Sequence, residues 1–248
     1  MLLEWKALKK NDRAINFNSV QILNIFINGS NHIPIDQFRE MDFLSVEKFR
    51  LPIELMMENA GLHLARLVTN CLPFKGNILI GIGPGNNGGG GLVAARRLAA
   101  WGYKVYLQIP VLPLQPLPQL QLERAMAFGA MTDSIDKPDV FIDAWLGFSQ
   151  RLPLSDTILN AVEMANRYSC PKISLDLPTG FDKDSGDILF KPDIIMTLAA
   201  MKTELLPLLG NIDIYIADLG LPHEVYTKFG LELPEKFKLS GLLHCQTA

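Results

Sequence analysis

Two aspartates stand at the ends of apolar runs that are typical of buried strands. Asp143 follows Phe141 and Ile142, Asp176 follows Leu175, and each precedes a loop that contains glycine. Because an open α/β sheet binds its ligands at the carboxyl ends of its strands, we expect both carboxylates to face one crevice. A carboxyl group there can move protons if burial or a like charge raises its pKa, and carboxylate oxygens also suit a hard cation. For each aspartate taken alone, a cap of a helix or turn is the alternative.

A glycine-rich segment, residues 81–91, lies between a predicted strand and a predicted helix. Backbone N–H groups and the helix dipole favour an anion such as a phosphate at that position. The glycines fit the G-x-G-x-x-G spacing, but the second strand does not end in the carboxylate that an ordinary dinucleotide site needs about 20 residues further on. The adjacent amides of Asn86 and Asn87 favour a binding site over the alternative, a merely tight turn.

Apolar periodicity divides the chain into alternating helices and strands. We predict helices over residues 36–48, 92–101, 122–130 and 155–168, and a further helix that begins at Pro52. Strands are predicted over residues 77–80, 104–109, 140–144, 172–177, 193–198 and 212–217. Four prolines between residues 110 and 119 predict an extended loop, and Gly102 is placed to end a helix in the left-handed conformation. The alternation predicts an α/β fold with a parallel sheet and helices on both faces.

Composition excludes several classes of protein. With 48% hydrophobic and 20% charged residues, the 248-residue chain has enough apolar side chains for a sizeable core. The formal charge of −3 argues against a nucleic acid partner, and no apolar run approaches the ~18 residues of a membrane span. The 3 cysteines are scattered without metal spacing and indicate a reducing compartment, so we expect a cytoplasmic protein.

The ends of the chain carry the weakest patterns. Residues 1–35 are predicted to be a poorly ordered extension, residues 36–235 the α/β domain, and residues 236–248 a C-terminal tail. Acidic residues are few near the N-terminus, so a transit peptide that would direct the protein to mitochondria remains an alternative for residues 1–35.

Five segments together resemble one known family, the YjeF N-terminal domain family, and occur in the family's order. They are Met57–Gly61, Gly83–Gly89, Asp143–Gly147, Asp176–Gly180 and Asp218–Pro222. The resemblance spans residues 36–235 and implies a three-layer Rossmann-like fold, often found as a homodimer. It also implies an NAD(P)H-hydrate epimerase, which interconverts the R and S forms of hydrated NADH and NADPH (NADHX and NADPHX) in nicotinamide nucleotide repair.

The resemblance implies roles for the residues that match the family motifs. Asp176 would be the acid–base residue at the hydrated carbon. The substrate would be bound by Asn86, Asn87, Gly88, Gly89, Gly90, Gly147, Phe148, Ser149, Asp176 and Lys202. The charge of Lys202 would help to hold phosphate or to orient Asp176. A potassium ion would be held by Asn87, Asp143 and Thr179, where the family commonly has serine at the last position.

The sequence departs from the family pattern at three places. Gly90 replaces the usual aspartate, the loop over residues 147–153 is several residues shorter, and Met201 replaces a proline before Lys202. A lost carboxylate and a shorter loop change charge and water exclusion at a site. Two alternatives to an active epimerase therefore remain: a catalytically impaired domain that binds a nucleotide or a protein, and an ordinary NAD-dependent oxidoreductase, which the missing ribose carboxylate disfavours.

Overall fold

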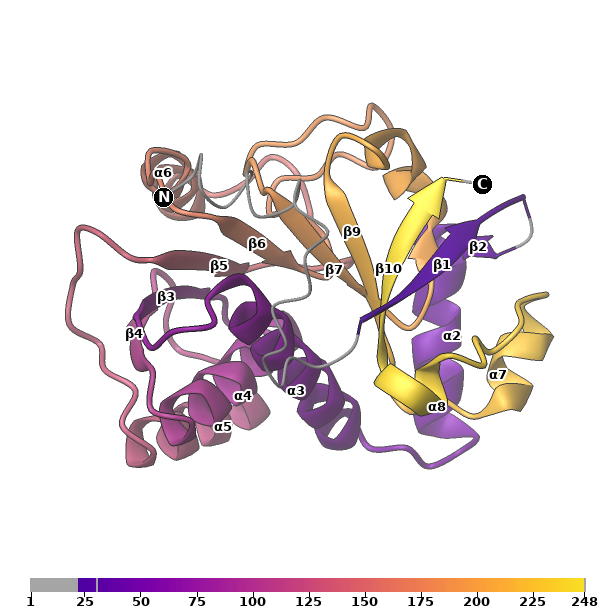
Figure 1. Cartoon of the computed structure of the whole chain (residues 1–248), viewed down its shortest axis with the longest axis horizontal. Helices are drawn as coiled ribbons and strands as arrows, with labels where there is room; N and C mark the ends of the chain where they lie inside the picture. The colour runs from indigo at the N-terminus through magenta and orange to yellow at the C-terminus, as the bar shows by residue number, and fades with distance from the viewer. Residues whose placement is uncertain (1–21, 30, 248) are drawn as a thin grey trace.

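A single large sheet forms the centre of the molecule (Figure 1). In the computed structural model, which describes residues 22–29 and 31–247, this sheet has 8 strands in the order β1-β10-β9-β7-β6-β5-β3-β4. The strands are β1 (Leu23–Ile27), β3 (Asn77–Ile82), β4 (Lys104–Gln108), β5 (Val140–Ala144), β6 (Lys172–Leu175), β7 (Ile194–Leu198), β9 (Asp213–Ala217) and β10 (Leu242–Thr247). Only the β9–β10 pair is antiparallel, so the predicted α/β fold with a mostly parallel sheet is confirmed within the described residues.

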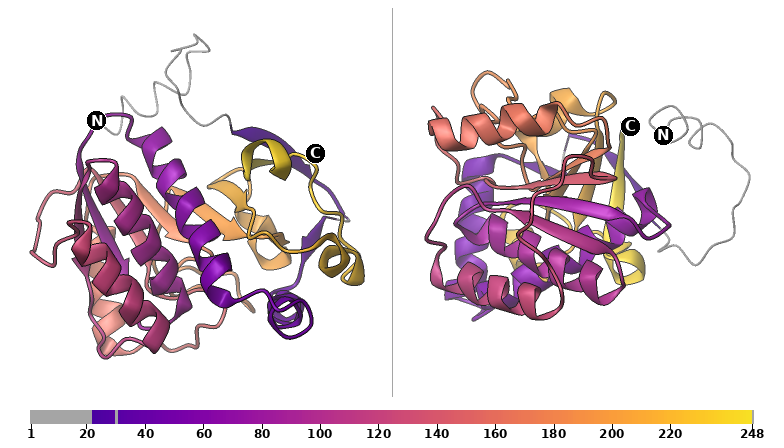
Figure 2. Two further views of the ribbon diagram at one scale, coloured as in Figure 1. Left: turned by 90° about the horizontal axis from the view of Figure 1, so that it is seen from below. Right: turned by 90° about the vertical axis from the view of Figure 1, so that its left-hand side faces the viewer.

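Helices cover both faces of this sheet. One layer holds α3 (Ile53–Cys71), α4 (Asn86–Ala100) and α5 (Pro116–Ala127), which lie side by side across the sheet in the left-hand view of Figure 2. The opposite face carries α6 (Asp156–Asn166). The remaining elements lie toward the β10 side: α2 (Ile35–Glu47), α7 (His223–Lys228), α8 (Phe237–Ser240), the 3-10 helix η1 (Thr203–Leu208), and a small sheet of β2 (His32–Ile33) and β8 (Met201–Lys202).

Strand side chains alternate between two cores, because successive residues of a strand point to opposite faces. On β3, Ile78 and Ile80 belong to the core under α3, α4 and α5, whereas Leu79 belongs to the core under α6. On β5, Ile142 joins the first core and Phe141 the second. Burial on both faces explains why these strands are nearly continuous apolar runs, which is the pattern that predicted them.

Two helix starts differ from the prediction. Helix α4 begins at Asn86 and not at residue 92, so its glycines belong to the first turns of the helix and not to a loop. Helix α5 begins at Pro116, inside the segment that was expected to be an extended loop. Proline fits the first turn of a helix because an N–H group there has no partner within the helix, and the proline density of the segment hid this start. The left-handed Gly102 after α4 is confirmed, with φ of 88°.

The two ends of the described chain complete the sheet, which corrects the expectation of an extension up to residue 35 and a tail from residue 236. Strand β1 pairs in parallel with β10, with Leu23 opposite Leu243. Strand β10 pairs with β9, with Leu243 opposite Ile216. Strand β1 lies at the sheet edge and exposes 59% of Phe26, so it lacks the uniformly apolar pattern of a central strand. The possible transit peptide falls largely on residues 1–21, which lie outside the described residues.

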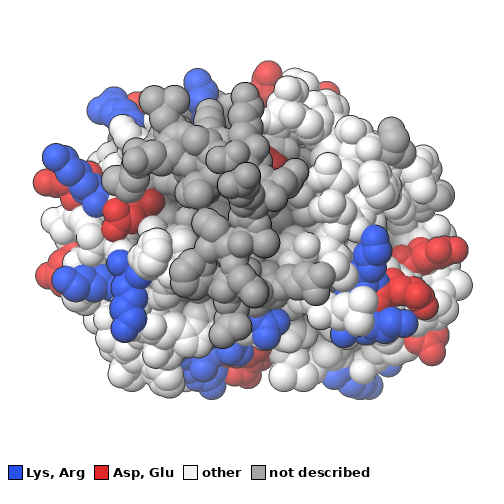
Figure 3. All heavy atoms as spheres, viewed as in Figure 1, with Lys and Arg blue, Asp and Glu red and all other residues white. Residues whose placement is uncertain are grey.

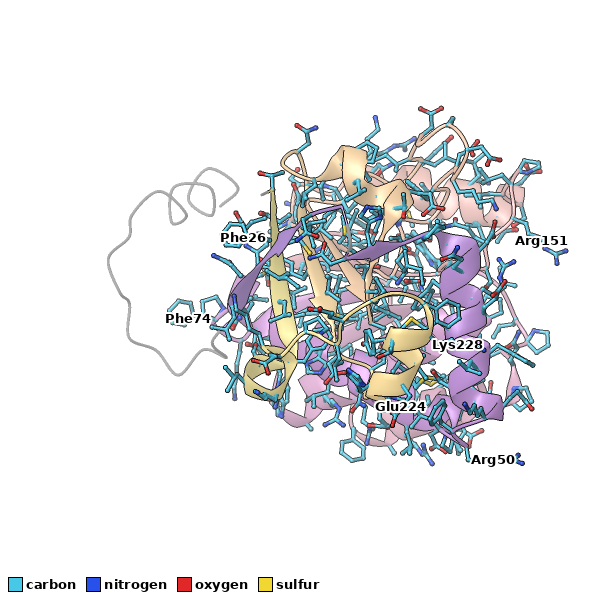
Figure 4. The ribbon with its side chains drawn as sticks, turned by 90° about the vertical axis from the view of Figure 1, so that its right-hand side faces the viewer. Phe26, Arg50, Phe74, Arg151, Glu224 and Lys228 are labelled. Carbon is cyan, nitrogen blue, oxygen red and sulfur yellow. The ribbon has the colours of Figure 1, made fainter. Side chains whose placement is uncertain are left out.

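The surface carries mixed charge. Lysine and arginine side chains alternate with aspartate and glutamate side chains around the face drawn in Figure 3. Figure 4 shows the labelled Phe26 and Phe74 pointing outward on one side of the molecule, where Phe74 is 74% exposed. Among the described residues, no helix is long and apolar enough to cross a membrane.

Candidate functional site

A cavity of about 340 Å³ opens at the carboxyl ends of the central strands. We call it the strand-end cavity; its walls come from α2, α3, the first turns of α4, the segment 145–150 after β5, and the end of β6. The predicted site residues that line it are Asn86, Asn87, Gly90, Gly147, Phe148, Ser149 and Asp176. The carboxyl-end placement that the sequence predicted therefore gathers most of the expected binding residues around one volume.

Asp176 is held in an unusual backbone conformation at the floor of the cavity. Its φ of 68° is left-handed, a region that side chains other than glycine seldom adopt. Its Oδ2 accepts a hydrogen bond of 2.7 Å from the backbone N–H of Phe148, and its own N–H donates to the Met196 carbonyl at 2.8 Å. Gly147 must be a glycine here, since a Cβ atom would lie 2.7 Å from that Oδ2 and 3.2 Å from Oδ1 of Asn87. The loop after β5 thus fixes Oδ2 of the carboxylate.

Lys202 lies behind Asp176 and is fully buried, so it does not line the cavity as the resemblance suggested. Its Nζ is 3.3 Å from Oδ1 of Asp176 and donates a 2.6 Å hydrogen bond to the Leu198 carbonyl. The Nζ also sits 3.5 Å from the centre of the Phe38 ring, within the range of a cation–π contact. Burial lowers the pKa of Lys202, and the Asp176 carboxylate opposes that shift. The lysine therefore contacts Asp176 and is not among the residues that line the cavity.

Asp143 is buried beneath the cavity and is surrounded by donors. Thr179 donates to it twice, from Oγ1 at 2.6 Å and from the backbone N–H at 2.8 Å. Ser174 Oγ donates at 2.9 Å and the backbone N–H of Trp145 at 3.3 Å. Burial raises the pKa of Asp143 to about 6, and these hydrogen bonds oppose the shift. No lysine or arginine contributes to that balance.

The structure therefore brings two of the three predicted potassium ligands into direct contact. Asp143 bonds to Thr179, whereas Asn87 lies beside Gly147 and has no hydrogen bond to either. The buried Asn87 amide nitrogen has no hydrogen-bond partner in the described part of the chain. A buried carboxylate without a neighbouring cation, together with hydroxyl and amide oxygens, fits a monovalent or hard cation. The described residues hold no cluster of three or more His, Cys, Asp or Glu side chains, so such a cation would depend on mixed oxygen donors.

Gly88 and Gly89 serve packing and do not line the cavity. A Cβ atom added at Gly88 would lie 2.0 Å from the carbonyl oxygen of Gly83. A Cβ atom added at Gly89 would lie 2.5 Å from the Met57 side chain. The N–H of Gly89 already donates to the Gly85 carbonyl at 3.1 Å. The N–H groups of residues 86–88 remain the free donors of the helix terminus, because the first turn of a helix offers them no acceptor. Asn86 and Asn87 line the cavity, so their N–H groups are the ones placed to receive a phosphate there.

Sequence analysis missed Asp42 and Gln150. Asp42 of α2 lines the cavity, and the spacing of buried Phe38, Met41 and Ser45 places it on the buried face of that helix. A charged residue on an apolar helical face was therefore a visible signal. Gln150 also lines the cavity, where its side chain donates to the Pro178 carbonyl at 3.1 Å and accepts from the Gly180 N–H at 2.7 Å. Only tertiary structure reveals this clamp.

The sequence matches the family model of the YjeF-related protein N-terminus over residues 53–204, which is more than half of the chain. The chain belongs to this family. The matched segment contains the residues after β3, β5 and β6 that form the strand-end cavity, and the resemblance drawn from the five motifs is thereby confirmed.

Relatives of this chain include proteins named NAD(P)H-hydrate epimerase. NAD(P)H-hydrate epimerase of Rhodopirellula baltica is 32% identical over 213 residues, 79% of this chain and 86% of the relative. The epimerase of Dehalogenimonas lykanthroporepellens is 34% identical over 212 residues, 81% of this chain and 86% of the relative. The epimerase of Anopheles darlingi is 32% identical over 200 residues, 75% of this chain and 87% of the relative.

A solved structure has the same architecture. The crystal structure of yeast ynu0, YNL200c, superposes with a TM-score of 0.77 and 25% sequence identity, and covers 86% of this chain and 98% of that chain. The YjeF-related fold therefore extends beyond the residues of the family model.

Proposed function

We propose that this protein is an NAD(P)H-hydrate epimerase that interconverts the R and S forms of NADHX and NADPHX. One observation carries the proposal: the Asp176 carboxylate faces a cavity whose rim includes the free N–H groups at the start of α4. The relatives named as epimerases support the same activity, because the chain covers most of their length. The cavity joins an acid–base group to an anion-binding helix end, which is what a phosphorylated substrate with a reactive ring requires.

The substrate would lie across the cavity with its phosphates at the N-terminus of α4. Asn86 and Asn87 would add amide hydrogen bonds, and the segment Gly147–Ser149 would cover the nucleotide. The hydrated ring would then face Asp176, whose position is fixed by the Phe148 N–H and by Lys202. Asp176 would move a proton to or from the hydroxyl on the hydrated carbon.

Potassium is proposed as a structural cofactor held by Asp143, Thr179 and Asn87. When bound, it would supply the positive charge that neutralises the buried Asp143 carboxylate. The absence of a lysine or arginine from the charges acting on Asp143 supports this site. Thr179 keeps the hydroxyl oxygen that the commoner serine would provide, and it ties the turn after β6 to the strand end of β5.

The first test is epimerisation of purified R-NADHX in potassium buffer, followed by chromatography that separates the epimers. A sample without enzyme corrects for spontaneous epimerisation. Acceleration well above this background is expected. A folded protein that binds NADP⁺ without accelerating epimerisation would favour the alternative, a catalytically impaired binding module. Gly90 and the short loop over residues 147–153 are the sequence features that favour this alternative.

A second test concerns the cation. Replacing potassium with lithium at equal ionic strength should reduce the rate and lower the unfolding temperature of the wild-type protein. The same exchange should leave Asp143→Asn unchanged, because that variant lacks the charge that the cation neutralises. Equal responses of both proteins would place the salt effect elsewhere.

The assembly and the compartment complete the proposal. A homodimer is expected from the family resemblance, and light scattering on a sizing column tests it. A cytoplasmic location is expected, with mitochondria as the alternative if residues 1–35 act as a transit peptide. Fractionation of cells that express the full chain decides between the two.

A further inference from the structure

Asp42 reaches the strand-end cavity from α2, a helix that carries none of the predicted site residues. Phe38, Met41 and Ser45 form the buried face of α2, and Asp42 lies one turn after Phe38 on the same side. The carboxyl group lines the cavity together with Asp176. Among the described residues, no hydrogen bond or ion pair engages this carboxyl group, so the group is available to a ligand.

Helix α2 is fixed against the Asp176–Lys202 pair at two levels. Its first N–H, from Ile35, donates to both carboxylate oxygens of Glu204 at 3.0 and 3.1 Å. One turn before Asp42, the Phe38 ring packs on the Lys202 Nζ and meets the Phe148 ring edge-to-face at 5.2 Å between centroids. Figure 4 shows α7 packed beside α2, with Glu224 and Lys228 labelled on α7. Asp42 is therefore held in position by packed aromatic rings.

The environment of Asp42 differs from that of Asp176. Burial raises the pKa of Asp42 above its usual range, the Asp176 carboxylate adds to that shift, and Lys202 opposes it. Asp176 instead has the Lys202 ammonium and the Phe148 N–H as direct partners. Two carboxyl groups in one cavity thus have contrasting partners, an arrangement that separates acid and base roles.

Resting on the proposed epimerase function, we propose that Asp42 is a second catalytic carboxyl group, which serves the face of the hydrated ring opposite to Asp176. An epimerase must handle a hydroxyl group on either face of one carbon. A single carboxylate on one wall reaches one face well. Asp42 on α2 and Asp176 after β6 line the strand-end cavity from different elements, and we assign one face of the ring to each carboxyl group.

The step balances without an oxidant or reductant. Protonated Asp42 gives its proton to the hydroxyl on the hydrated carbon, and the carbon–oxygen bond breaks with its electron pair leaving as water. The lone pair of the adjacent ring nitrogen forms a carbon–nitrogen double bond and leaves a planar cation. Water then adds to the opposite face, and its proton goes to ionised Asp176. Proton exchange with solvent returns the two carboxyl groups to their starting states, while the reverse reaction uses them in exchanged roles.

The test compares Asp42→Asn with Glu40→Gln, a control that removes an exposed carboxylate from the same helix. We expect Asp42→Asn to lower kcat at least 100-fold, within the range of general acid–base catalysis, with KM changed less than about threefold since proton transfer is not ground-state binding. Glu40→Gln should retain wild-type kcat. Affinity for NADP⁺, whose nicotinamide ring carries no hydroxyl group, should be unchanged in both variants.

The pH profile separates a catalytic from a structural role. Asp42→Glu should recover part of kcat, and Asp42→Asn should lose the limb of the kcat profile that reports the protonated carboxyl group. Asp176 and Lys202 also face this position, and they remain in every variant. A loss of kcat with an unaltered profile, or retention of kcat within threefold, would overturn the role of Asp42 while leaving the epimerase intact. A folded wild-type protein without epimerase activity would instead overturn the proposed function, and this inference with it.

Discussion

The ends of β5 and β6 are adjacent and look alike in sequence, yet they form opposite environments. Asp143 near the end of β5 is enclosed, accepts hydrogen bonds from Thr179, Ser174 and Trp145, and is fully buried. Asp176 after β6 lines the strand-end cavity, adopts a left-handed backbone and is paired with Lys202. We call the end of β5 the closed end and place the proposed cation there, and we call the end of β6 the open end and place the proposed chemistry there.

The difference arises from the elements beyond the strands. Phe148 and Gly147 pass over Asp176 and leave room for a ligand, whereas the turn through Thr179 folds back onto Asp143. Gln150 clamps the two segments together. The environment of an aspartate at a strand end therefore depends on the loop that follows it, and spacing along the sequence does not report that.

The largest expected effect concerns Asp176, at the open end. Asp176→Asn should lower the epimerisation rate at least 100-fold, because an amide cannot exchange a proton in the required range. Asparagine tolerates the left-handed conformation, so the backbone at this position is preserved. The measurement is the initial rate on R-NADHX, with the circular dichroism spectrum as a check of folding. Full activity in this variant would remove Asp176 from the mechanism.

The next largest effect concerns Asp143, at the closed end. Because the folded-state pKa of Asp143 is raised from its ordinary value of 3.8 to about 6, the native protein binds this proton more tightly than the unfolded chain. The stabilisation is complete below about pH 4 and is lost as pH rises to about 6, with a size of about 3 kcal/mol. Asp143→Asn should lack this loss.

Urea unfolding of both proteins between pH 4 and pH 7, in buffer without potassium, measures the effect. The free energy of unfolding of the wild type minus that of Asp143→Asn should fall as pH rises, since all other carboxylates are common to both proteins. The misplaced amide of the variant adds an offset that does not depend on pH. Potassium at pH 7 should restore part of the difference. A difference that stays flat would show that Asp143 is ionised throughout.

Much of the sheet and of the cavity was predictable because it depends on local patterns. Apolar runs identified β3, β5, β6, β7 and β9, and the rule of carboxyl ends placed Asp176 and the start of α4 at one crevice. The start of α4 was predicted late because glycines favour turns in short sequence windows. In the structure they are required instead by the close approach of α4 to α3 and to the sheet.

The features that escaped prediction depend on contacts between distant residues. Strand β1 is stabilised by β10, more than 200 residues later, and neither has a pattern strong enough alone. For Lys202 the sequence left open whether it holds phosphate or orients Asp176; it is buried behind Asp176, in contact with the Phe38 ring, a placement that only the tertiary packing shows. Asp42 belongs to a helix whose amphipathic spacing was recognised, although the charge on its buried face was not interpreted.

The smallest effect tests whether the closed and open ends impose different packing limits on α4. Gly91 faces the β5 end, where a Cβ atom would lie 2.6 Å from Cβ of Ala144, and Gly90 faces the β6 end, where the nearest atom is Cδ2 of Leu175 at 3.0 Å. Ala144 Cβ cannot rotate away, whereas the end of the Leu175 side chain can shift.

Alanine gains about 1 kcal/mol of helix propensity over glycine, and overpacking a core costs about 1–3 kcal/mol. Gly91→Ala should therefore destabilise by up to about 2 kcal/mol and Gly90→Ala should be neutral or slightly stabilising, as measured by urea unfolding. Equal effects of the two substitutions would mean that α4 shifts as a unit and that the two strand ends are not packed independently.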